Sequence, residues 1–196
     1  MAAEGITIER EDMRRQPPAR EERRLVREAQ SGSGEALAGL YAAHWRRAHR
    51  AAYLVVHDAA AAEDVAQEAF LAAVDALDRF DRRRPFAPWL HRIVVNRAID
   101  WARRESLRRR VEEDDRGSSE ALASERGGDP ARAPGSELMA ALAELPPEQR
   151  AVVVLRYLLD YRPGEIGRML ELRRGTVNSR LRRGLDRLGE LLEEER

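Results

Sequence analysis

The strongest constraint on the fold lies near the C-terminus, where residues 161–183 are typical of two short helices joined by a tight turn. Pro163 suits the first turn of a helix, where its missing N–H group costs nothing. The second helix is predicted to bury four apolar residues on one side, namely Val177, Leu181, Leu185 and Leu188. Its other side carries side chains that can hydrogen-bond to base edges in the major groove, namely Arg174, Asn178, Ser179, Arg182 and Arg183. This layout favours a helix-turn-helix unit whose second helix reads DNA.

A plainer interpretation of the same segment stays open, because arginine-rich amphipathic helices are usually solvated faces and most helical hairpins bind nothing. One residue also departs from the pattern. Glu171 occupies the turn position where helix-turn-helix units usually carry glycine. A left-handed conformation costs a residue with a side chain about 1 kcal/mol, so we expect this turn to be built differently.

Composition excludes several classes of protein. The chain has no cysteine, which rules out disulfides and cysteine-based metal sites. No stretch is apolar for long enough to cross a bilayer, and residues 1–15 are charged without the apolar segment of a secretory signal. A cytoplasmic location is therefore the expectation. All 35 basic residues are arginine and the net charge is zero, so arginine abundance by itself indicates no function.

The hydrophobic periodicity predicts an all-α chain of two small helical domains joined by a flexible linker. Residues 1–19 are predicted to form a disordered tail. The first domain, residues 20–110, is predicted to hold helices over 21–30, from about 34 to 56, from about 61 to 79 and from about 89 to 104 or beyond, with a loop at 81–88. An acidic linker is predicted over 111–135. The second domain, residues 136–196, is predicted to hold helices over 137–145 and 148–159, followed by the hairpin.

The third predicted helix has two different sides. One is an apolar stripe of Ala66, Phe70, Ala73, Val74 and Leu77. The other is acidic and carries Glu63, Asp64, Glu68, Asp75 and Asp78, with Gln67 and Leu71 among them. Such a face is either a solvated surface or a docking surface for a basic partner.

The fourth predicted helix also has two sides. It is predicted to bury Leu90, Ile93, Val94, Ala98 and Trp101, while Trp89, Arg92, Asn96, Asp100 and Arg103 lie opposite. The preceding loop adds Arg82, Arg83, Arg84 and Phe86. Exposed aromatic rings beside arginines suit nucleic-acid binding through stacking and phosphate contact. The alternative for each ring is packing in the core.

These residues resemble a known family. Residues 63–70 and 88–100 are similar to the second conserved region of bacterial sigma factors of the extracytoplasmic-function (ECF) class, in the sigma-70 superfamily. Residues 145–150 and 175–181 resemble the fourth region of the same proteins. The resemblance covers about residues 21–104 and 136–192, in the family's order and with a linker between them.

The resemblance implies a transcription initiation factor without catalysis, cofactor, small-molecule substrate or membrane insertion. Its partners would be promoter DNA and core RNA polymerase, through the clamp helices of the largest subunit and the flap. Such factors are commonly held inactive by an anti-sigma protein. The residues implied in polymerase binding are Asp64, Gln67, Glu68, Leu71 and Asp75. Those implied at the minus-ten element are Arg84, Phe86, Trp89, Arg92, Asn96 and Arg103. Those implied at the minus-thirty-five element are Arg173, Arg174, Thr176, Asn178, Ser179, Arg180, Arg182 and Arg183.

The sequence argues against two other classes of protein. An ordinary helix-turn-helix regulator would use its first domain for dimerisation or sensing and bind palindromic DNA, but the asymmetric plan and the acidic helix argue against it. An enzyme lacks support, because His44, His49, His57 and His91 show no metal-site or catalytic-triad spacing with carboxylates. We interpret these histidines as structural.

Overall fold

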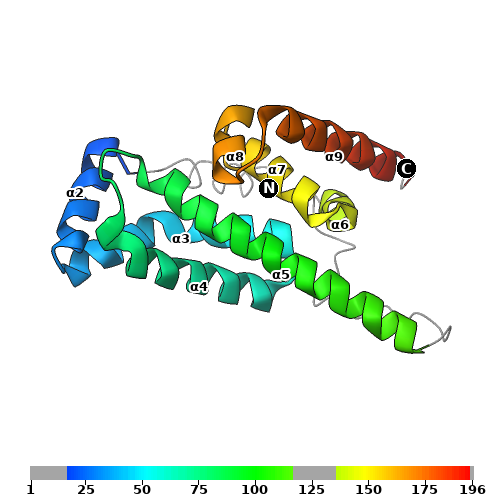
Figure 1. Ribbon diagram of the computed structural model, residues 1–196, viewed down its shortest axis with the longest axis horizontal. Coiled ribbons are helices and arrows are strands. Elements are labelled where there is room, and N and C mark those ends of the chain that lie inside the picture. The colour runs from blue at the N-terminus through cyan, green and yellow to red at the C-terminus, as the bar shows by residue number, and fades with distance from the viewer. Residues whose placement is uncertain (1–16, 117–135, 195–196) are drawn as a thin grey trace, which may run out of the picture.

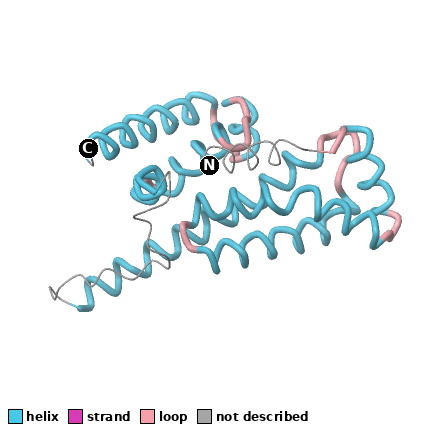
Figure 2. Tube along the Cα trace, turned by 180° about the vertical axis from the view of Figure 1, so that it is seen from behind, coloured by secondary structure: helices cyan, strands magenta, loops and turns pink. Residues whose placement is uncertain are grey.

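Helices make up all the regular structure in the part of the chain that the computed structural model describes, residues 17–116 and 136–194 (Figures 1 and 2). The elements are α2 (Ala19–Gln30), α3 (Gly34–Val56), α4 (Ala59–Ala76), the 3-10 turn η1 (Leu77–Arg79), α5 (Phe86–Arg116), α6 (Ser136–Glu144), α7 (Pro147–Tyr157), α8 (Pro163–Met169) and α9 (Arg174–Glu194). The prediction of an all-α chain with two helical domains is confirmed.

The first domain is a bundle in which α3, α4 and α5 pack against one another and α2 packs on α3 (Figure 1). Side-chain caps fix where two of these helices begin. The Ser33 hydroxyl accepts a hydrogen bond from the Ala36 N–H at 3.2 Å, and the Asp58 carboxylate accepts one from the Ala61 N–H at 2.8 Å. Each cap satisfies an N–H group that has no partner inside its own helix.

The predicted apolar stripe of α4 is buried except at one position. Ala66, Phe70, Ala73 and Leu77 are buried, whereas Val74 is 38% exposed. Val74 belongs to the apolar stripe but faces an open groove lined by α3 and α4.

Helix α5 begins three residues before the predicted start and runs past the predicted end of the first domain at residue 110. It begins at Phe86, since Pro88 falls in the first turn, where proline is tolerated. It continues to Arg116, so the linker prediction is wrong for residues 111–116, which are helical. Glu105 pairs with Arg108 and Arg109, three and four positions later, and so supports the extension. The rest of the predicted linker, 117–135, and most of the predicted tail, 1–16, lie outside the described residues.

The second domain is built around α9, which α6, α7 and α8 contact. Proline occupies the first turn of α7 and of α8, as predicted for Pro163. The turn between α8 and α9 keeps the usual left-handed residue, with Glu171 at φ 56°. The expectation of a differently built turn is therefore wrong, and the chain bears the conformational cost of a non-glycine residue there.

The buried face of α9 differs from the prediction at one position. Val177, Leu181 and Leu188 are buried, but Leu185 is 41% exposed and its neighbour Gly184 is buried instead. A Cβ atom at Gly184 would lie 3.2 Å from Val153 Cγ2, which shows how closely α9 passes α7 at this point. The absence of a side chain at Gly184 lets the helices approach and turns Leu185 toward solvent.

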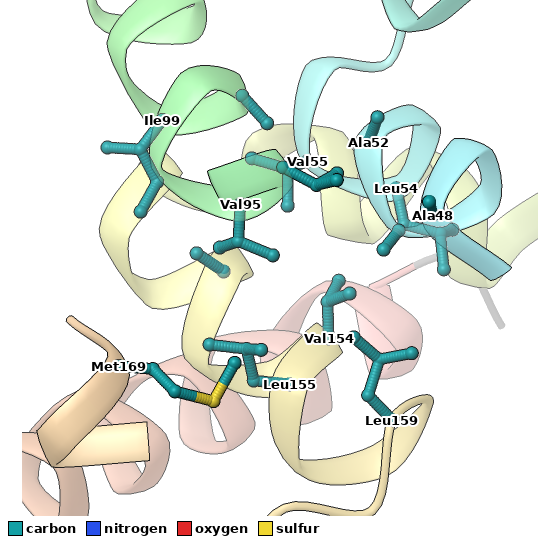
Figure 3. Packing of buried hydrophobic residues seen from close by; sticks show 14 of the residues in the cluster. Ala48, Ala52, Leu54, Val55, Val95, Ile99, Val154, Leu155, Leu159 and Met169 are labelled. Carbon is teal, nitrogen blue, oxygen red and sulfur yellow. The ribbon is translucent and has the colours of Figure 1, made fainter. Parts of the chain in front are cut away.

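The two domains are in contact, which the sequence did not indicate. Helices α6 and α7 contact α3, and α7 and α8 contact α5. Figure 3 shows apolar residues of α3 and α5 above Val154, Leu155 and Leu159. A charged hydrogen bond crosses the same boundary, where Arg150 Nη1 donates to the Val55 carbonyl at 2.6 Å. The apolar cores of the two domains thus form one continuous cluster.

Candidate polymerase and nucleic-acid interface

The five α4 residues implied in polymerase binding all lie on the surface. Leu71 is 66% exposed, an unusual position for a large apolar side chain. Two of the polar members have neighbours: Gln67 donates to the Glu63 carboxylate at 3.1 Å, and Glu68 lies 3.3 Å from Arg97 of α5. The five residues implied in polymerase binding, all exposed, are Asp64, Gln67, Glu68, Leu71 and Asp75.

Beside this acidic surface lies an apolar groove that the sequence analysis missed. Its volume is about 510 Å³, and its lining includes Leu37, Tyr41, Phe70, Leu71 and Val74. Because the lining residues come from both α3 and α4, no periodicity within one helix reveals the groove. Tyr41 and Leu71 are exposed on its rim.

The aromatic residues before and within the first turn of α5 form a cluster. Phe80 and Trp89 have ring centroids 4.7 Å apart, and Phe86 lies 5.5 Å from Trp89. Phe86 is only 3% exposed, so its prediction as a DNA contact is corrected. The ring fills the space between α3 and α5 and supports Trp89, which stays partly exposed.

The remaining minus-ten candidates reach the surface, two of them in ion pairs. Arg84 is exposed and Asn96 is partly exposed. Arg92 donates a hydrogen bond to Glu171, in the turn before α9, and Arg103 donates one to Glu148 of α7. Burial raises the pKa of Glu148, but the hydrogen bond from Arg103, the helix N–H groups and the charges of Arg103 and Arg180 together leave it below its usual value. The carboxylates of Glu148 and Glu171, which pair with these two arginines, both belong to the second domain.

The minus-thirty-five candidates lie along the N-terminal half of α9 and the residue before it. Five of them are exposed: Arg173, Arg174, Asn178, Arg182 and Arg183. The other three, Thr176, Ser179 and Arg180, are partly exposed. The structure thus brings all eight together at one end of the second domain, on the residues that follow the left-handed turn.

Family models match both domains. Residues 40–108 match sigma-70 region 2, and residues 136–188 match sigma-70 region 4. The ECF RNA polymerase sigma factor SigM of Mycobacterium tuberculosis is 32% identical over 170 residues, which cover 83% of this chain and 80% of SigM. The chain belongs to the ECF class of RNA polymerase sigma factors. This is a family of transcription initiation factors.

Solved structures of sigma factors share the fold. CnrH, known from Cupriavidus metallidurans, was solved in complex with the cytosolic domain of CnrY. It aligns to this sigma factor with a TM-score of 0.66 at 28% identity, covering 90% of this chain and 99% of CnrH. RpoE of Bartonella quintana, solved with the anti-sigma factor NepR, shares the fold with a TM-score of 0.57 at 23% identity, over 76% of this chain and 91% of RpoE.

Within residues 17–116 and 136–194, no helix combines the length and the apolar character that a membrane span requires. In the same ranges, histidine, aspartate and glutamate side chains form no group of three that could hold a metal ion.

A buried polar cluster joins the two domains of this sigma factor, and sequence spacing gave no sign of it. His91 of α5 is fully buried, and its Nδ1 lies 2.7 Å from the Tyr161 hydroxyl. His44 of α3 is also buried, with its Nε2 3.3 Å from Glu22, an ion-pair distance without hydrogen-bond geometry. Burial lowers the pKa of His91 to about 3, and the positive potential of His44 and Arg47 adds to this shift.

This cluster predicts that the sigma factor loses stability in mild acid. His91 stays neutral in the folded chain, while the unfolded chain binds a proton there below about pH 6.5. Stability is therefore fully present above that pH and falls as the pH drops toward the folded-state pKa. Between pH 7 and pH 5 the loss from this group is expected to be about 1–2 kcal/mol.

Chemical denaturation at the two pH values measures the effect. In the variant His91→Asn, which keeps a polar atom near Tyr161 but does not titrate, the difference between pH 7 and pH 5 should shrink by that amount. Burial raises the pKa of Glu22, but the neighbouring His44 and the hydrogen bond from the Phe86 N–H lower it on balance, so Glu22 titrates below this window. An equal pH dependence in both proteins would contradict the assignment to His91.

Proposed function

We propose that this sigma factor binds core RNA polymerase through α4 and directs it to promoters. Helix α5 would contact the minus-ten element and help to open it, and α9 would read the minus-thirty-five element. The observation that carries the proposal is the placement of base-reading side chains on one helix of each domain. The two asparagines of the chain, Asn96 and Asn178, lie on these two helices.

The surface of α4 supports the polymerase contact. Its exposed carboxylates suit a basic partner, and the exposed Leu71 supplies apolar area beside the groove. The clamp helices of the largest polymerase subunit are the proposed partner, with the flap as the partner of the second domain. This role would place the chain in the cytoplasm.

The surface of α5 supports the minus-ten contact. Trp89 offers a partly exposed ring for base stacking, held from behind by Phe86. Arg84, Arg92 and Arg103 can meet phosphates, and the Asn96 amide can pair with a base edge. Holding unstacked bases in this way offsets part of the few kcal/mol that unstacking costs.

The surface of α9 supports the upstream contact. Asn178 is exposed one turn into the helix, where recognition helices contact base edges. Arg183 lies further along the helix and suits a phosphate contact. The proposed contacts are Arg173, Arg174, Thr176, Asn178, Ser179, Arg180, Arg182 and Arg183.

An anti-sigma protein is part of the proposal. The similar sigma factor CnrH was solved with the cytosolic domain of CnrY bound. We expect a protein of this kind to cover the α4 surface here and so compete with core polymerase.

Transcription by core polymerase on a promoter library, with and without this sigma factor, tests the function. Asn178→Ala should change base preference at one or two upstream positions by about 1–3 kcal/mol. Arg183→Ala should weaken all promoters about equally and lower the slope of affinity against salt by about one.

Arg187→Ala is the matched control, because Arg187 lies one turn further along α9 and already pairs with Glu190 at 3.0 Å. It should leave both base preference and salt slope unchanged. Wild-type preference of Asn178→Ala at every upstream base would count against α9 as the reader. No promoter-directed transcript from the wild-type protein would count against the function itself.

A further inference from the structure

Helix α2 is bonded to both ends of the loop that leads into α5 (Figure 1). This arginine loop, residues 81–85, carries three exposed arginines in a row, Arg82, Arg83 and Arg84. The proposed function gives α2 no role, and α2 precedes the match to sigma-70 region 2, which begins at residue 40. Its contacts with the loop therefore ask for a separate explanation.

Gln30, the last residue of α2, holds the start of the arginine loop. Its side-chain Nε2 donates to the Leu77 carbonyl at 2.8 Å and to the Phe80 carbonyl at 3.0 Å. A side-chain amide nitrogen carries two N–H donors, so both are engaged on the backbone between α4 and the loop. The acceptors lie 47 and 50 positions further along the chain. The place from which the loop departs is thus set by α2.

Glu22, near the start of α2, holds the other end of the loop. Pro85 directly precedes α5 and has no side-chain oxygen that could cap the helix. The cap comes from α2 instead, because the Glu22 carboxylate accepts a hydrogen bond from the Phe86 N–H at 3.2 Å. A carboxylate is favourable at the positive end of a helix dipole. Glu22 is only 7% exposed, and a buried carboxylate is costly unless it is hydrogen-bonded, so this contact is specific.

Aromatic rings connect the base of the arginine loop to Trp89. Phe80 and Phe86 meet edge to face with ring centroids 5.8 Å apart, and Phe80 lies 4.7 Å from Trp89. Inside the loop, Asp81 accepts hydrogen bonds from the Arg83 N–H at 3.0 Å and from Arg83 Nε at 2.9 Å. A shift of Phe80 would therefore move both the loop and the ring proposed to stack on a minus-ten base.

We propose that Gln30 and Glu22 are positioning residues for minus-ten DNA, through which α2 keeps the arginine loop and Trp89 in the arrangement that holds unstacked bases. The inference rests on the proposed function, since it takes the loop and α5 to be the minus-ten surface. Neither side chain would touch DNA, because Glu22 is buried and the Gln30 amide is engaged with backbone. A preorganised surface binds more tightly because less ordering is left to do on binding.

The variants Gln30→Met and Glu22→Met remove the two contacts at nearly unchanged side-chain length. Glu22→Gln is the conservative variant, because its amide oxygen can still accept the Phe86 N–H. Val26→Ala is the matched control. Val26 lies between the two residues on α2 and is 2% exposed, so this variant loses packing of the same helix but keeps both contacts with the loop. It should lower the melting temperature at least as much as Gln30→Met.

Three quantities are measured, with core polymerase and a promoter that the wild-type protein selects from the library. They are the affinity for core polymerase, the ratio of open to closed complexes from permanganate reactivity, and hydrogen exchange over residues 77–87 of the free protein. We expect Gln30→Met and Glu22→Met to lower the open-to-closed ratio roughly three- to tenfold, as the loss of one or two hydrogen bonds allows. Core affinity should stay the same and exchange should become faster. Glu22→Gln should restore most of the ratio.

An unchanged open-to-closed ratio in Gln30→Met would overturn the proposal, even with faster exchange. A fall of the same size in Val26→Ala would also overturn it, because loss of stability alone would then explain the defect. If the wild-type protein opens no promoter, the proposed function fails and the role of α2 fails with it. If the wild type opens its promoter and only the variants disagree, positioning by α2 alone has failed.

Discussion

Replacing Arg150 by methionine is expected to destabilise the protein by about 3–5 kcal/mol, because two buried carbonyl groups and a partly buried one lose a charged donor. The Arg150 guanidinium donates hydrogen bonds to the carbonyls of Val55 at 2.6 Å, Ala143 at 2.6 Å and Leu145 at 2.8 Å. Val55 and Ala143 lie in the last turns of α3 and α6, where carbonyls lack partners inside the helix. One guanidinium thus completes the ends of helices from both domains, and its positive charge suits the negative ends of their dipoles.

Arg156→Met on the same helix is the matched control. Arg156 lies 3.3 Å from Asp160 in an exposed pair, a kind that contributes about 0–1 kcal/mol. Denaturant unfolding of the three proteins measures the difference. Similar losses in the two variants would show that Arg150 acts only as one more charged residue of α7.

Gly167→Val is expected to cost about 2–4 kcal/mol and to abolish promoter-specific binding, because a side chain at this position collides with the turn of the helix-turn-helix unit. A Cβ atom at Gly167 would lie 2.7 Å from the Leu172 carbonyl oxygen. That oxygen belongs to the backbone, so the clash can be relieved only by moving α8 away from the turn. The same turn is closed by the Leu172 N–H, which donates to the Gly167 carbonyl at 2.8 Å.

The control for this prediction is Gly189→Val, where a Cβ atom has open space around it. It introduces the same side chain into a helix of the same domain without a steric conflict. Thermal unfolding followed by circular dichroism, together with promoter binding, separates the two variants. A stable, DNA-binding Gly167→Val protein would show that the helix-turn-helix unit tolerates a different crossing angle.

Local patterns predicted the helices because their causes lie within a few residues of each other. Caps such as Ser33 and first-turn prolines such as Pro163 act on the nearest backbone groups. The errors fall where a neighbouring helix decides the outcome. Leu185 is exposed because Gly184 meets α7, and Phe86 is buried because α2 and α3 cover it, with the Glu22 carboxylate accepting a hydrogen bond from its backbone N–H.

The sequence by itself determined the helical class, the two-domain plan and the family. These follow from periodicity and motif, which depend on short separations along the chain. Only the tertiary structure decided that the domains pack together, that His91 meets Tyr161, and that Glu148 and Glu171 bond to Arg103 and Arg92. These contacts join residues that are 45 or more positions apart. They arise from the fit of two completed surfaces, which periodicity within one helix does not encode.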